Sequence, residues 1–137
     1  MARAFLVVAA ALLLAGCGGG GKGDAGPTVP CNDASFRAQD EELYVTHAVV
    51  KNTIAGAGDP TQVLLDLHRA RKALAGYLDA HPPCEQGLRA IAATEHGAIT
   101  ALDEAIAARE AGNDDSEPLA RAKAALERAQ SALAGAR

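Results

Sequence analysis

Apolar residues recur at helical spacing in four stretches between Asn32 and the C-terminus, and this periodicity constrains the fold more than any other feature of the 137-residue chain. Nothing in this part of the sequence alternates between apolar and polar residues as a β-strand would. The pattern predicts helices over about 33–55, 60–81, 83–111 and 117–135. Four amphipathic helices with short connections favour an all-α, antiparallel up-down-up-down four-helix bundle over residues 32–137.

Each predicted helix has one apolar stripe, and these stripes define the expected core. The inward positions are Phe36, Leu43, His47, Val50 and Ile54 in the first helix, Val63, Leu67, Ala70, Leu74 and Tyr77 in the second, Leu88, Ile91, Ile99, Leu102 and Ile106 in the third, and Leu119, Ala122, Leu126, Ala129 and Leu133 in the fourth. The fourth stripe has the spacing of a heptad seam.

Glycine, proline and acidic residues separate the helices. The Gly-Ala-Gly run at 56–58 ends the first helix, and Asp59 with Pro60 supplies a capping side chain and a first-turn proline for the second. The Pro-Pro pair at 82–83 separates the second helix from the third, since a proline disfavours helical backbone in the residue before it. Asp33 is expected at the N-terminus of the first helix, where negative charge is favourable.

The composition excludes some functions and limits the core. A net charge of −4 and a pI of about 5.5 leave no basic footprint for nucleic acid. Hydrophobic residues make up 49% of the chain, but many of them are alanine, and only 3% of the residues are aromatic. Alanine allows helices to approach closely and buries little area, so we expect a modest stability per residue.

The N-terminus has the pattern of an export signal. Arg3 supplies a positive charge, and residues 5–15 form an unbroken apolar run. About 20 apolar residues are needed for a helix that stays in a bilayer, so this run is too short for a permanent span. It has the proportions of a signal-peptide core.

The end of that run, Leu14-Ala15-Gly16-Cys17, resembles the lipobox of bacterial lipoproteins at all four positions. The resemblance covers the N-terminus only. It implies that diacylglycerol is attached to the Cys17 thiol, that the lipoprotein signal peptidase removes residues 1–16, and that the new amino group is acylated. Several acyl chains, palmitate among them, would give a stable membrane anchor. The alternative is an ordinary cleaved signal peptide in which Cys17 is incidental.

Residues 17–31 then form the expected tether. Glycine and proline dominate this stretch and almost nothing in it can be buried, so we predict a flexible linker that spans roughly 20 Å. The signal and tether together predict a cell-envelope protein, lipid-anchored to the cell membrane or the outer membrane and facing the periplasm or the exterior.

With Cys17 lipidated, Cys31 and Cys84 remain as an even pair in an oxidising compartment. In an up-down-up-down bundle the first and third helices start at the same end. Cys31 precedes the first predicted helix and Cys84 lies in the first turn of the third, so the topology brings the two thiols together. We therefore predict a disulfide, with two unpaired small apolar side chains as the alternative.

The candidates for a metal site are His47, His68 and Glu95. Both histidines lie at or beside an apolar stripe, roughly 24 Å along the bundle from the cysteine end, and Glu95 interrupts the third stripe. Imidazole and carboxylate groups could bind Zn²⁺ or another divalent ion. The alternative is that each side chain is hydrogen-bonded or hydrated at a stripe boundary, and no metal or other cofactor is expected beyond the lipid on Cys17.

No arrangement of catalytic residues can be picked out, so the sequence predicts a non-catalytic protein. The favoured hypothesis is a helical-bundle binding module, held to the membrane by its lipid and contacting a protein partner of the envelope. Two alternatives stay open: a carrier of a metal or small ligand in the bundle interior, and a structural spacer of the envelope.

Overall fold

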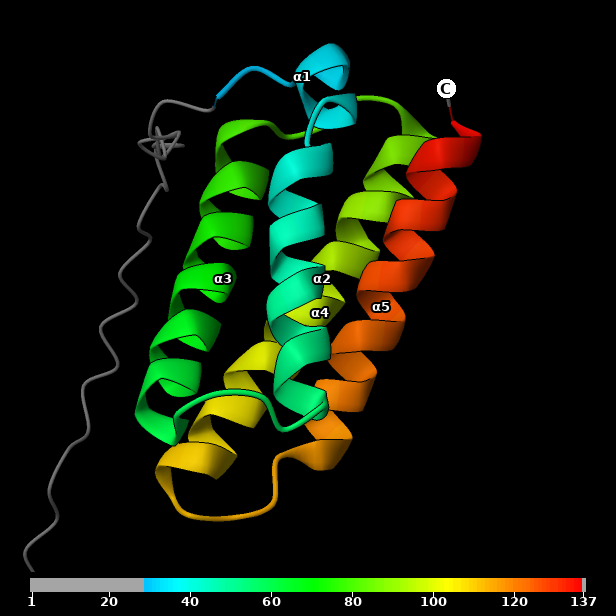
Figure 1. Ribbon diagram of the computed structural model, residues 1–137. Coiled ribbons are helices and arrows are strands. Elements are labelled where there is room, and N and C mark those ends of the chain that lie inside the picture. The colour runs from blue at the N-terminus through cyan, green and yellow to red at the C-terminus, as the bar shows by residue number, and fades with distance from the viewer. Residues whose placement is uncertain (1–28, 137) are drawn as a thin grey trace, which may run out of the picture.

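The computed structural model describes residues 29–136, which form a single helical bundle (Figure 1). A short helix, α1 (Asp33–Arg37), precedes four long ones, which are α2 (Asp40–Ile54), α3 (Pro60–Ala80), α4 (Gln86–Glu110) and α5 (Ser116–Gly135). The predicted all-α four-helix class is confirmed. The predicted signal peptide, Cys17 and the tether up to residue 28 lie outside the described residues.

The four long helices run antiparallel in chain order. Helix α2 packs against α3 and α5, and α4 packs against the same two helices, so α2 lies diagonally opposite α4. The α2–α3 and α4–α5 loops both lie at one end of the bundle (Figure 1). Helix α1, the α3–α4 connection and the end of α5 occupy the other end. This is the up-down-up-down topology that the short connections predict.

The prediction of one continuous helix over 33–55 is wrong in one respect. The chain forms two helices there, α1 and α2, which are separated by a turn. Ala38 and Gln39 form a turn in which the Ala38 and Gln39 N–H groups donate to the Ser35 and Phe36 carbonyls, at 3.0 and 3.4 Å. The turn lets α1 lie across the end of the bundle, where Phe36 is fully buried. Alanine and glutamine both favour helices, so nothing local in the sequence signals this break.

The other helices begin and end close to the predicted capping, glycine and proline residues, with one exception. Asp59 accepts hydrogen bonds from the Thr61 and Gln62 N–H groups at 3.0 and 3.1 Å, with Pro60 in the first turn of α3, as predicted. The exception is α4, which begins at Gln86 instead of residue 83. Residues 81–85 form an irregular connection, since the two prolines disfavour helical backbone before them.

The core matches the predicted stripes closely. Every stripe residue of α4 and α5 is less than 9% exposed, and so are Leu67, Ala70 and Leu74 in α3. Ile54 departs from the prediction with 44% exposure, because Thr53 takes the inward position at the end of α2 and donates its hydroxyl to the Val49 carbonyl. Among residues 29–136, no helix is long and apolar enough to cross a bilayer.

Candidate functional site

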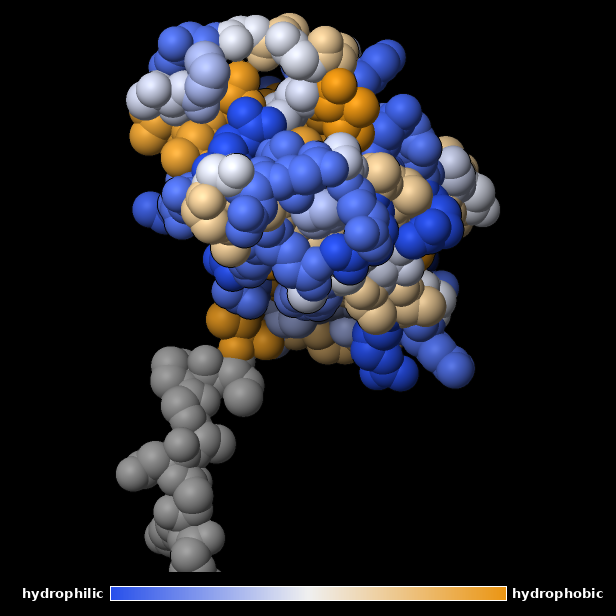
Figure 2. Space-filling view, turned by 90° about the horizontal axis from the view of Figure 1, so that it is seen from below, coloured by the Kyte–Doolittle hydropathy of each residue, from blue (hydrophilic) through white to orange (hydrophobic). Residues whose placement is uncertain are grey.

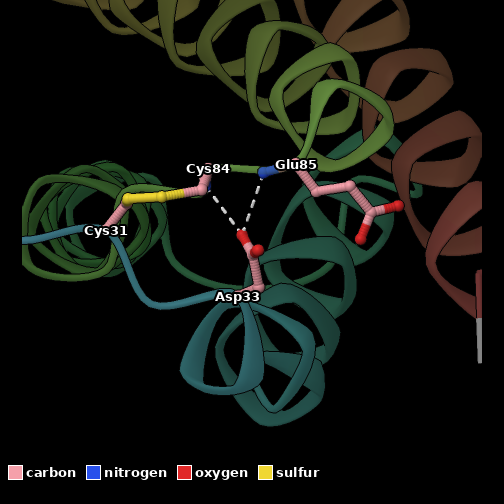
Figure 3. The surroundings of a disulfide bond; sticks show 4 residues. All are labelled: Cys31, Asp33, Cys84 and Glu85. Atoms are coloured by element: carbon pink, nitrogen blue, oxygen red, sulfur yellow. Dashed lines mark hydrogen bonds between the residues drawn. A yellow bond between two sulfur atoms is a disulfide. The ribbon is translucent and has the colours of Figure 1, made fainter.

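The predicted disulfide is present at the α1 end of the bundle (Figure 3). Cys31 and Cys84 are 53 residues apart in sequence and have Cα atoms 5.4 Å apart. Both residues are exposed. Cys84 lies in the connection before α4 and not in its first turn, which corrects the predicted position. The bond therefore links the segment just before α1 to the segment just before α4.

Further bonds reinforce this junction. One Asp33 carboxylate oxygen accepts from the Cys84 N–H at 2.7 Å and from the Glu85 N–H at 3.2 Å (Figure 3). The Asn32 N–H donates to the Pro82 carbonyl at 2.9 Å, and the Arg37 guanidinium pairs with the Glu85 carboxylate. Asp33 therefore serves the N-terminus of α4. The first helix is capped by the Asn32 side chain, which accepts from the Ser35 N–H.

The structure separates the three metal candidates. His68 on α3 lies beside Glu110 on α4, with the ring Nε2 and a carboxylate oxygen 3.0 Å apart. His47 on α2 points toward α5, where its Nε2 lies 3.6 Å from a Glu127 oxygen and makes no hydrogen bond. The α3–α4 and α2–α5 faces are opposite sides of the bundle, so one ion cannot reach both rings.

Glu95 lies inside the bundle and meets neither histidine. Its side chain is 0% exposed, and neither carboxylate oxygen has a hydrogen-bond partner within the described chain. Burial raises the pKa of Glu95 from 4.5 to about 7, and the nearby Gln39 amide opposes this shift without meeting hydrogen-bond geometry. Across residues 29–136, no three His, Cys, Asp or Glu side chains come close enough to hold a metal ion. The predicted constellation is therefore not assembled.

A surface feature that the periodicity did not identify runs between α2 and α5. Two adjoining pockets there share Tyr44 and Gln130 and together form a shallow groove, whose apolar lining includes Ala48, Ala134 and the edge of the buried Leu43. Tyr44 is 65% exposed, although it is one of only four aromatic residues in the chain. A tyrosine outside the apolar stripe of its helix is the signal that could have drawn attention to this face. We call this feature the Tyr44 groove.

The loop end of the bundle has a different character. Figure 2 views this end directly, and hydrophilic side chains cover most of its centre, with apolar residues in separate patches toward the edge. Of the large apolar side chains, Ile54 near this end is 44% exposed and Leu65 on α3 is 46% exposed. In this view the apolar residues of the loop end therefore form no single continuous patch.

No protein-family model, curated protein or solved structure matches this chain. Its function is therefore inferred from its own residues. These residues comprise a disulfide junction, one buried acid whose pKa is raised to about 7, and an exposed tyrosine in a groove.

Proposed function

We propose that this chain is a lipid-anchored lipoprotein of the bacterial cell envelope whose helical bundle is a non-catalytic binding module. The Cys31–Cys84 disulfide is the observation that carries the proposal. Such bonds persist in oxidising compartments, which is where the signal and lipobox at Cys17 would deliver the chain. With Cys31 and Cys84 paired, the third cysteine of the chain is Cys17, the residue at the expected lipidation position.

The junction at the α1 end supports this arrangement mechanically. The disulfide and the Asp33 hydrogen bonds hold the chain entry to the start of α4, so a pull on the tether would act on the bundle itself. Helix α4 has 25 residues, equivalent to roughly 37 Å. A lipid on Cys17 would place the α1 end toward the membrane and the loop end away from it. The sides of the bundle would face other envelope proteins.

The binding role is supported by the exposed Tyr44 and the groove around it. Aromatic residues are enriched at protein interfaces, since one side chain can bury a large area with little loss of conformational entropy. The buried Glu95 is closed off from solvent, and the two histidines lie near carboxylates on separate faces of the bundle. The surface is therefore better suited to binding than to chemistry.

The anchoring can be tested by metabolic labelling with an alkyne analogue of palmitate in cells that express the full chain. We expect labelling of the wild-type chain, loss of the label in Cys17→Ala, and recovery of the labelled chain with membranes. The matched control is the Cys31→Ser/Cys84→Ser double variant, which removes the other two thiols and should keep the label. A Cys17→Ala chain that still incorporates the label would overturn the proposed anchor.

A further inference from the structure

The Tyr44 groove has a defined length and direction. It follows α2 from Asp40 to Asn52, with Gln130 and Ala134 contributing from α5. Twelve residues of helix correspond to roughly 18 Å, which is the length of a three-turn helix. Since the groove lies between two long helices, a third helix laid along it could pack against both.

Two exposed side chains near opposite ends of the groove, Glu41 and Lys51, carry opposite charges. Glu41 at the α1 end and Lys51 toward the loop end are both exposed, and neither forms an ion pair with any other described residue. They are ten residues apart on α2, or roughly 15 Å. Glu127 on α5 does not line the groove; it pairs with Lys123 and lies near His47. The groove therefore presents an acidic end and a basic end to whatever occupies it.

Tyr44 lies next to the acidic end. Its ring is mostly exposed, and the Glu41 carboxylate lines the same part of the groove. An aromatic face combined with a carboxylate suits a lysine or arginine side chain, because the ring attracts the cation and the carboxylate pairs with it. The accessible apolar surface of the groove comes mainly from the Tyr44 ring, Ala48 and Ala134, and the two alanines leave room for small aliphatic side chains.

We propose that the Tyr44 groove binds an amphipathic helix of a partner protein, about three turns long, with a lysine or arginine over Tyr44 and Glu41 and an acidic residue beside Lys51. This inference rests on the proposed function as a binding module and names the partner that such a module would take. The apolar face of the partner helix would cover the groove, as in other helix-in-groove complexes. The end charges would fix its direction and register.

The test is site-specific photocrosslinking in the native cell, with p-benzoylphenylalanine incorporated at position 44 of the full-length chain. This residue keeps an aromatic ring in the groove. The matched control is the same residue at position 65 on α3, since Leu65 is also about half exposed and lies outside the groove. We expect a protein crosslink at position 44 and not at 65, and mass spectrometry should place it in a helix-forming segment with a lysine or arginine.

Charge reversal then tests the register. Glu41→Lys should reduce the position-44 crosslink roughly fivefold or more, because it opposes the cation of the partner. Asp79→Lys, a charge reversal at an exposed site on α3 outside the groove, should leave the yield unchanged. A yield that does not respond to Glu41→Lys would overturn the inference.

The outcomes separate this inference from the function it rests on. A protein crosslink at position 65 without one at 44 would overturn the inference about the groove. It would leave the proposed function as a binding module standing. A position-44 product that is a second copy of this chain, a lipid, or a segment without basic residues would do the same. The absence of protein crosslinks at both positions, with no partner recovered after general amine crosslinking of the cells, would overturn the proposed function itself.

Discussion

Gln39 and Glu95 face each other inside the bundle, and both side chains are fully buried without a hydrogen bond to any described residue. Gln39 reaches the core from the turn between α1 and α2, and Glu95 reaches it from the middle of α4. Removing polar groups from water without partners is costly. A neutral carboxyl group costs far less to bury than a carboxylate, and this explains why burial raises the pKa of Glu95 to about 7.

The raised pKa of Glu95 makes the stability of the bundle depend on pH. Between about pH 4.5 and 7 the folded chain holds a proton on Glu95 that the unfolded chain has released. The free energy of unfolding should therefore fall as the pH rises through this window, by up to about 3 kcal/mol, and level off above it. Urea unfolding at about pH 5 and about pH 8 measures the difference.

Glu95→Gln isolates this contribution, because an amide of similar shape does not ionise. We expect the variant to lose most of the pH dependence and to be more stable than the wild type at about pH 8. Glu117→Gln, an exposed glutamate on α5, is the control and should follow the wild-type profile. If Glu95→Gln and the wild type show the same difference between the two pH values, then Glu95 does not titrate in this window.

The disulfide should supply a large share of the stability. A bond between residues 53 apart restricts the unfolded chain and contributes about 4 kcal/mol in the chain-entropy model. The Cys31→Ser/Cys84→Ser double variant should lose up to that amount in urea unfolding, and reductant should destabilise the wild type and leave the double variant unchanged. Equal stability of the two proteins without reductant would show that the bond does not contribute.

The sequence predicted the parts of this fold in which the local pattern and the tertiary structure agree. The stripe from Leu119 to Leu133 is regular, and the whole of it is buried. The break at Ala38 and Gln39 could not be predicted, because both residues favour a helix and the turn depends on burying Phe36 across the end of the bundle.

The candidate sites show the same division. The pairing of Cys31 with Cys84 followed from the bundle topology together with the even number of cysteines left after Cys17, and it is confirmed. The grouping of His47, His68 and Glu95 used distance along the helix axis, which does not fix the direction around the axis. A grouping by depth along the bundle therefore could not show that the two histidines point to opposite faces. The position of Gln39 opposite Glu95 was missed because Gln39 lies in the unpredicted turn.

Two glycines offer a matched test of backbone conformation. Gly97 lies in the middle of α4, is exposed, and has open space where a Cβ would be, so Gly97→Ala should stabilise the bundle by about 0.5–1 kcal/mol. Gly112 has equally open space, but its φ is +70°, and Gly112→Ala should destabilise by about 1 kcal/mol. Thermal unfolding of the two variants should shift in opposite directions, and a shift in the same direction would contradict the assignment of Gly112 to the left-handed region.

Asp33 provides the last test, because its carboxylate connects the start of α1 to the start of α4. The two residues that donate to it, Cys84 and Glu85, are 51 and 52 residues away in sequence. Asp33→Ala removes the acceptor for the Cys84 and Glu85 N–H groups and a negative charge near the start of α4. We expect a loss of about 1 kcal/mol in the free energy of unfolding. Asp33→Asn keeps an oxygen acceptor without the charge and should lose less.

Hydrogen exchange provides a local measure of the same bonds. The Cys84 and Glu85 amides should exchange faster in Asp33→Ala, while the Thr61 and Gln62 amides, which Asp59 caps, should be unchanged. Unaltered exchange at Cys84 and Glu85 would show that Asp33 does not hold the start of α4.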